Sequence, residues 1–182
     1  MSTRPKRGNA AAARTRRFAR QHDSAAGQYE QLAMDDRLSL RDRARARMWV
    51  GTALSKNGNH DYAASVMRAA SRDFENLSEV KDWLIAQQKL ALAHRGAGDL
   101  SGALHFIDIA RSTSALDSPM QRVRLDTAHG HILLSDPATA TNGLAVLAAA
   151  AGLAAKYGMS HRLQSIDGIR RDYGRRPALG RR

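Results

Sequence analysis

The residues that could carry metal or acid–base chemistry are seven histidines and seventeen acidic side chains. His129 and His131 form the closest histidine pair, but on a helix residues i and i+2 project about 200° apart and cannot share one ion. Asp35 and Asp36 are adjacent in an expected loop with no histidine nearby, which favours a solvated turn over an acid–base dyad. The chain has no cysteine, which excludes disulfides and thiolate metal ligands.

The serine and glycine motifs of common enzyme classes are also missing from the sequence. No G-x-S-x-G nucleophile motif occurs, and the glycine-rich turns lack the G-x4-G-K-[ST] order that holds a phosphate. Gly96 and Gly98 stand between two helical patterns with no strand before them, which excludes a dinucleotide-binding fingerprint. The sequence therefore predicts a protein that is not an enzyme, with no cofactor and no metal site.

The elements that position these side chains follow a repeated template. A shift of 40 residues superposes the segment 50–70 on the segment 90–110, with small residues on small and large apolar residues on large apolar residues. Each copy predicts an amphipathic helix, a Gly turn at Gly58 or Gly98, and a second helix with Ala at close contacts. The second-helix core positions are Ala63, Met67 and Ala70, then Ala103, Ile107 and Ala110, and in a third copy Gly143, Leu147 and Ala150.

These positions resemble the tetratricopeptide pattern, W-x2-L-G-x2-Y followed by A-x3-F. The matching stretches are Arg47-x2-Val50-Gly51-x2-Leu54 with Ala63-x3-Met67, and Gln87-x2-Leu90-Ala91-x2-His94 with Ala103-x3-Ile107. The Trp and Tyr positions differ, and the longer period resembles the repeats in sensing domains of actinobacterial helix-turn-helix regulators. The resemblance implies an all-α, right-handed array of antiparallel helix hairpins, a TPR-like solenoid of about eight helices. In such a fold His94, which occupies the Tyr position, is a packed and hydrogen-bonded imidazole.

Capping signals place the expected helices along the chain. Ser39 with Asp42 is a capping box before a helix over 40–56, and Ser118 before a proline starts the third hairpin. Asp136 before a proline predicts a helix over 138–157. The remaining helices are expected over 23–34, from 61 to 76, from about 79 to 95, over 100–112, and from Ser160 onward as a terminal cap.

The net charge of +12 is concentrated at the two ends of the chain. Residues 1–20 have seven basic groups and no acid, and residues 170–182 have six Arg and one Asp. We therefore divide the chain into a basic, disordered N-terminal arm (1–22), a TPR-like helical repeat domain (23–173) and a basic, disordered C-terminal tail (174–182). Within the domain, Arg41, Arg43, Arg45 and Arg47 alternate along one helix and are expected to be solvated.

A repeat array with no catalytic motif predicts a binding protein. Its first helices would line an inner groove that suits a protein or peptide carrying an acidic group, with Lys56, Lys89 and Arg95 as carboxylate donors. The full set of predicted groove residues is Arg45, Met48, Thr52, Lys56, Gln88, Lys89, Leu92 and Arg95. The family resemblance adds a role as a regulatory adaptor linked to transcriptional control, and association into a homodimer stays open.

The alternative is a nucleic-acid-associated protein that binds DNA or RNA non-specifically through its arginine-rich tails. The N-terminal residues that would do so are Arg4, Lys6, Arg7, Arg14, Arg16, Arg17 and Arg20. No apolar run reaches the length of a membrane helix, and no export signal is assigned, so we expect a cytoplasmic protein.

Overall fold

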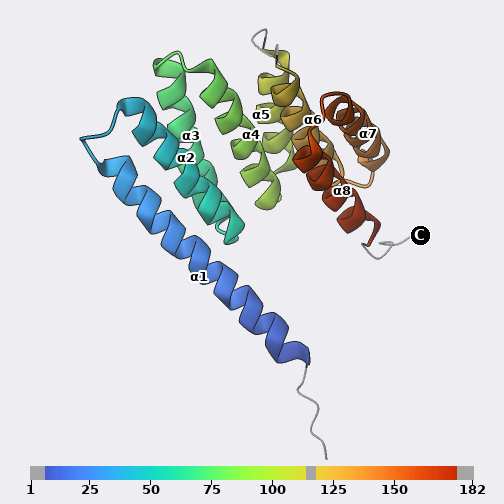
Figure 1. Cartoon of the computed structure of the whole chain (residues 1–182), viewed down its shortest axis with the longest axis horizontal. Coiled ribbons are helices and arrows are strands. Elements are labelled where there is room, and N and C mark those ends of the chain that lie inside the picture. The colour runs from blue at the N-terminus through green and yellow to red at the C-terminus, as the bar shows by residue number, and fades with distance from the viewer. Residues whose placement is uncertain (1–6, 114–117, 176–182) are drawn as a thin grey trace, which may run out of the picture. The chain divides into compact units, whose positions relative to one another are not determined.

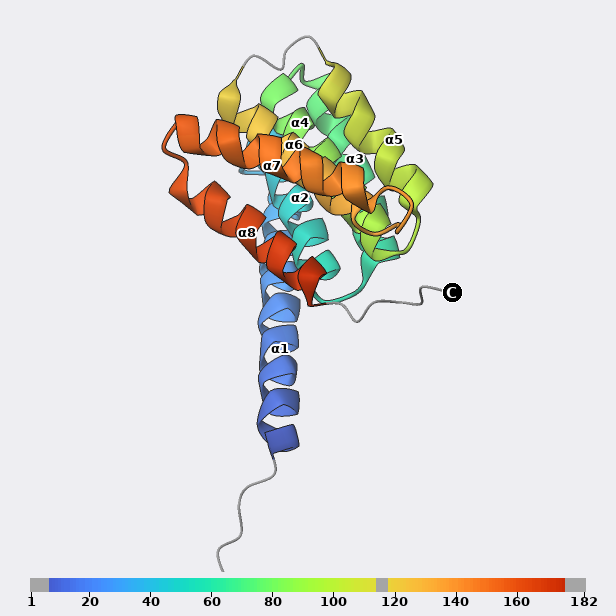
Figure 2. The same cartoon turned by 90° about the vertical axis from the view of Figure 1, so that its right-hand side faces the viewer.

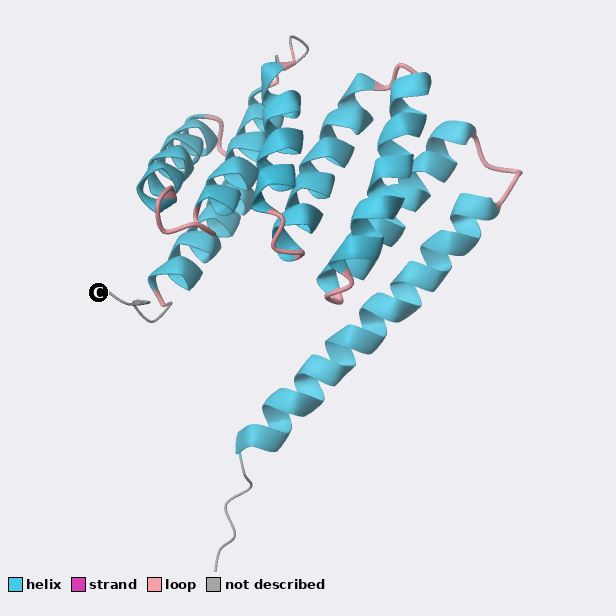
Figure 3. Ribbon diagram, turned by 180° about the vertical axis from the view of Figure 1, so that it is seen from behind, coloured by secondary structure: helices cyan, strands magenta, loops and turns pink. Residues whose placement is uncertain are grey.

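The structure, a computed structural model, describes residues 7–113 and 118–175, with side chains described from Arg20 onward. The basic residues Arg4 and Lys6 and the tail residues 176–182 lie outside the described residues. Within the described ranges the chain forms eight α-helices and no strand (Figures 1 and 3). The predicted all-α class and helix number are confirmed. The helices are α1 (Arg7–Met34), α2 (Leu40–Lys56), α3 (His60–Asn76), α4 (Val80–Gly96), α5 (Leu100–Ser112), α6 (Pro119–Leu133), α7 (Ala140–Lys156) and α8 (Ser160–Gly174).

Four helices end in turns with a left-handed residue, and the first three of these turns are spaced by twenty residues. Gly58, Gly98 and Gly158 all have positive φ angles, of 87°, 85° and 64°, and Ser78 occupies the same position after α3 with φ 55°. In the first of these turns Asn59 donates its N–H to the Leu54 carbonyl, and Gly58 donates to the Ser55 carbonyl. This is the Schellman arrangement, which satisfies the last carbonyls of a helix and needs a left-handed residue. A three-residue connection then starts the next helix.

The other helix boundaries follow local capping. Ser39 accepts a hydrogen bond from the Asp42 N–H at 3.1 Å, which confirms the predicted capping box of α2. Ser118 is the N-cap of α6 ahead of the proline, but its side chain makes no capping hydrogen bond. α7 begins at Ala140, later than predicted, because Asp136 accepts from the Ala138 N–H and holds a turn there.

Two compact units make up the chain, residues 1–86 and 87–182, and the boundary between them falls within α4. In the first unit α2 packs against both α1 and α3. Its core is formed by Ala44, Met48, Ala70, Phe74 and Ala86, with Trp83 and Ile85 partly buried against them.

The tight contact of the repeat template lies between α2 and α3. A Cβ added at Gly51 would lie 2.6 Å from the Met67 Cγ and 3.1 Å from the Ala63 carbonyl oxygen. Both neighbours are themselves fully buried. Glycine at position 51 therefore lets the two helices approach, as the template predicts.

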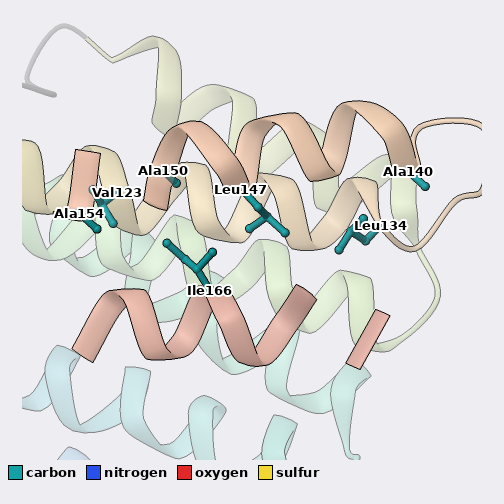
Figure 4. Packing of buried hydrophobic residues seen from close by; sticks show 7 residues of the cluster. All are labelled: Val123, Leu134, Ala140, Leu147, Ala150, Ala154 and Ile166. Atoms are coloured by element: carbon teal, nitrogen blue, oxygen red, sulfur yellow. The ribbon is translucent and has the colours of Figure 1, made fainter. Parts of the chain in front are cut away.

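In the second unit α5, α6, α7 and α8 pack in succession. The same close contact recurs between α6 and α7, because a Cβ at Gly130 would lie 2.7 Å from the Leu147 Cγ and 3.0 Å from the Gly143 carbonyl oxygen. α8 lies beside α7 and inserts Ile166 into the core (Figures 2 and 4). The buried cluster consists of Val123, Leu134, Ala140, Leu147, Ala150, Ala154 and Ile166.

α1 is much longer than the helix it packs against. It has 28 residues, about 42 Å, whereas α2 has 17 residues, about 26 Å. The Asn57 side-chain amide, just after the end of α2, donates to the Asp23 carboxylate of α1. Residues 7–22 therefore extend past α2 as a helix, as Figure 3 also shows. The expected helix over 23–34 is the second half of this element, and the division between arm and domain at residue 22 stays a prediction.

Candidate binding surfaces

The alternating arginines of α2 form ion pairs with acidic side chains, and their own side chains stay partly exposed. Arg41 donates through Nε to the Asp82 Oδ2 at 3.0 Å and pairs with Glu79 at 3.0 Å. Arg45 pairs with the same Asp82 oxygen at 3.0 Å. Asp82, at the start of α4, is only 6% exposed, and two guanidinium groups satisfy its carboxylate. Arg41 and Arg45 can both reach Asp82 because they are four residues apart and share one helix face; with side chains 41% exposed they also keep contact with solvent, as expected from the sequence.

The other two arginines share a different face of α2. Arg43 donates to the Asp36 carboxylate at 2.9 Å, and Arg47 pairs with Asp73 of α3. The alternating run therefore contains two i,i+4 pairs of arginines, Arg41 with Arg45 and Arg43 with Arg47, on two faces of α2.

The predicted groove residues on α2 have different environments. Met48 is 3% exposed and belongs to the core, so it lines no surface. Thr52 is half-buried and donates its hydroxyl to the Met48 carbonyl at 2.9 Å. Arg45 is held by Asp82. Lys56 lies in the last turn of α2 and is exposed to solvent.

The predicted groove residues on α4 lie in the second unit. Gln88, Lys89 and Leu92 are half-buried. Arg95 donates through Nε to the Ser135 Oγ at 2.8 Å and to the His131 carbonyl at 3.1 Å. Arg95 thus ties α4 to the end of α6, and a carboxylate ligand would have to compete with these acceptors.

His94 is packed and hydrogen-bonded, as its repeat position predicts. Its Nδ1 lies 2.8 Å from the Asp99 Oδ2, and its ring lies 4.9 Å from the Phe106 ring. Asp99 also accepts from the Gly102 N–H at 2.9 Å, capping α5. The Gly102 N–H and then His94 lower the pKa of the Asp99 carboxyl. This group is therefore a structural cap.

His129 has a buried ring nitrogen, Nδ1, without a hydrogen-bond partner among the described residues. Its side chain as a whole is half-buried on α6. Burial, and then the positive charge of Arg111, lowers its pKa, while Asp108 and Asp126 oppose that shift. In the part of the chain that the structure describes, no group of three or more His, Asp or Glu side chains could hold a metal ion.

An apolar groove lies over α2, between α1 and α3 of the first unit. Its volume is about 320 Å³, and its lining includes two exposed apolar side chains, Met34 at 77% and Tyr62 at 51%. Arg47 at its edge is neutralised by Asp73. The lining is completed by Glu30, Ala33, Val50, Ser65, Val66 and Ala69. Sequence reasoning missed this groove because it placed the binding surface on the first helices of the repeats.

Comparison with protein-family models, with curated proteins and with solved structures gives no match. Among the residues that the structure describes, none of the helices combines the length and the apolar character needed to cross a membrane.

Proposed function

We propose that the chain is a non-enzymatic, tetratricopeptide-like repeat module that binds a protein or peptide partner. The observation that carries the proposal is the recurrence of one buried triplet on three helices. Ala63, Met67 and Ala70 of α3 are buried, as are Ala103, Ile107 and Ala110 of α5, and Gly143, Leu147 and Ala150 of α7. Stacked helical repeats of this kind offer extended surfaces to partners. In the proposal the helices form antiparallel hairpins in a right-handed array.

The partner that we propose carries an acidic group. Lys56 is exposed at the end of α2, and Lys89 is half-buried on α4. A lysine ammonium donates to a carboxylate as a compact point charge. Arg45, Thr52, Gln88, Leu92 and Arg95 would flank these lysines in the proposed groove. By the resemblance to regulator sensing domains, the module would act as a cytoplasmic adaptor in transcriptional control.

Affinity capture with the full chain tests this function. Lys56→Glu and Lys89→Glu should together abolish capture of a reproducible partner while the circular dichroism spectrum stays unchanged. Lys81→Glu is the matched control, because Lys81 is an exposed lysine on α4 outside the proposed groove. Arg95→Glu is left out, since it would also break the contacts to Ser135 and His131. Equal capture by all variants would move the surface elsewhere, and a purified catalytic activity would end the proposal.

A second candidate is non-specific binding of nucleic acid through the basic ends. The feature that favours it is the extension of α1 past α2 from Arg7, because five Arg and no acid lie within residues 7–20 of that helix. Binding of this kind loses affinity steeply with salt, since arginines displace counterions from phosphates. A fluorescently labelled duplex whose affinity does not change between low and moderate salt would contradict it.

A further inference from the structure

One surface of the first unit, the apolar groove between α1 and α3, has a carboxylate that pairs with no residue the structure describes. Glu30 lines the groove and makes no ion pair or hydrogen bond with the described residues. The only other charge in the lining, Arg47, is already paired with Asp73. A ligand for this groove therefore combines an apolar or small-residue surface with a positive charge opposite Glu30.

The same face of α1 continues into the half that extends past α2. Positions 16, 20, 23, 27, 30 and 34 alternate in steps of four and three residues, so they form one stripe along the helix. The stripe is Arg16, Arg20, Asp23, Gly27, Glu30 and Met34. Asp23 and Gly27 are exposed, and a Cβ at Gly27 would meet nothing within 4 Å. Open space therefore borders this stripe beside the groove.

The two halves of α1 have opposite charges. Residues 7–20 contain five Arg and no acid, whereas residues 23–34 contain Asp23 and Glu30 and no Lys or Arg. Positive charge at a helix N-terminus and negative charge toward its C-terminus oppose the helix macrodipole, and α1 has no acid in its first turn and no base in its last. An antiparallel second copy of the same helix would reverse both mismatches, since each basic half would lie beside an acidic half.

We propose that two copies of the chain associate through antiparallel α1 helices, with residues 7–22 of each copy lying along the α1–α3 groove of the other. Residues 7–22 of the same molecule cannot occupy its own groove. Glu30, Ala33 and Met34 of the groove wall belong to α1 itself, and the helix is continuous from Arg7 to Met34, so its first half cannot fold back onto its second half.

The dimensions of the two elements agree with this pairing. Residues 7–22 measure about 24 Å as a helix, and α3, the opposite wall of the groove, measures about 26 Å. Small residues in the inserted segment, Ala10–Ala13 and Ala19, permit a close approach of helix axes. The arrangement is isologous, because the same surface serves both copies and closes the assembly at two. Neither Lys56 nor Lys89, the lysines of the proposed function, lines this groove.

A charge exchange between copies tests the pairing. In sedimentation equilibrium the full chain should form a dimer, and its dissociation constant should rise with salt. Glu30→Arg alone should weaken the dimer roughly tenfold, and so should Arg16→Glu combined with Arg20→Glu. Mixing the two variants should restore association to the original strength, because each inserted segment then meets a groove of opposite charge. Asp61→Arg, at an exposed position of α3 outside the groove lining, is the matched control and should leave the dimer unchanged.

Three outcomes would overturn the proposal. A monomer at every concentration would do so, and so would a dimer that Glu30→Arg leaves intact. An apparent mass that falls to the monomer after nuclease treatment would show that nucleic acid holds the copies together. Glu30 and Arg20 lie outside the core, so their substitution should leave the helical signal in circular dichroism unchanged. Weaker association with an unchanged signal is then due to the loss of interface contacts and not to unfolding.

Discussion

Replacing Gly51 by alanine tests the helix packing on which the repeat depends. An added Cβ would lie 2.6 Å from the Met67 Cγ, where ordinary van der Waals contacts begin at 3.4 Å. Met67 is 2% exposed and has little space to move, and the Ala63 carbonyl at 3.1 Å is part of the α3 backbone. Overpacking of this kind costs about 1–3 kcal/mol. Alanine also improves helix propensity by about 1 kcal/mol, so Gly51→Ala should be neutral to about 2 kcal/mol destabilising.

The matched control is Gly152→Ala in α7. Gly152 is exposed in a helix interior, and an added Cβ there would meet nothing within 4 Å. Only the propensity gain applies, so this change should stabilise the protein by about 0.5–1 kcal/mol. Urea unfolding followed by circular dichroism gives both free energies, and their difference isolates the packing cost at Gly51.

A combined variant identifies Met67 as the neighbour responsible. Met67→Ala removes the Cγ that a Cβ at position 51 would contact, at a cost of its own from the cavity. In that background Gly51→Ala should cost less by about 1 kcal/mol than in the wild type. Additive effects, or a Gly51→Ala protein as stable as Gly152→Ala, would refute the close approach of α2 and α3.

Three further predictions follow from local chemistry. Ser78→Gly should stabilise the protein by about 1 kcal/mol in urea unfolding, because Ser78 has φ 55°, which glycine adopts without the penalty of a Cβ; Gly98→Ala should do the reverse at φ 85°. Asp82→Ala should destabilise by about 1.5–3 kcal/mol, since it removes charged hydrogen bonds from two arginines, whereas Asp42→Ala should cost less. Because the pKa of His129 is lowered in the folded protein, the unfolded chain binds a proton at this histidine more readily than the folded chain does. The contribution of this group to the free energy of unfolding is therefore highest above pH 6.5, the ordinary pKa of histidine, and decreases as the pH falls below that value. His129→Gln should therefore reduce the loss of stability between pH 7.5 and 5.5.

The repeated core could be predicted from the sequence because packing constrains residue size. Equivalent positions of successive repeats make the same kind of helix contact, so they require residues of the same size class. The burial of Ala63, Ala103 and Ala150 follows from that pattern. Trp83 packs against the core, whereas Trp49 stays 42% exposed and stacks on Tyr29 of α1.

The turn after α3 shows why part of the backbone could not be predicted. The left-handed position is glycine after α2, α4 and α7, which the sequence makes visible. After α3 the same conformation is adopted by Ser78, because the hydrogen bonds of Glu79 to Phe74 and of Ser78 to Glu75 hold the turn against the cost of the Cβ. A twenty-residue helix period is therefore clearer in the structure than in the residue types.

Side-chain ion pairs were harder to predict than the core, because a charge pattern does not name its partner. The spacing of Arg41 and Arg45 selects one helix face, but only the packing of α2 beside the start of α4 brings Asp82 to it. The groove between α1 and α3 was missed for a related reason: the length of α1, which sets where Met34 and Glu30 lie, depends on a helix that continues back to Arg7.

Charged residues that take part in internal ion pairs can be distinguished from charged residues that do not. Residues 21–169 have no net charge, and much of the charge on α2 is used in internal pairs with Asp36, Asp73 and Asp82. Glu30 is different, because it lies beside apolar side chains and has no partner among the described residues. An unpaired carboxylate at the edge of a groove loses solvation if an apolar ligand covers it, so its presence favours a cationic ligand over a purely apolar one. The basic half of the same helix supplies that charge in a second copy, which makes Glu30 the residue at which self-association is most directly tested.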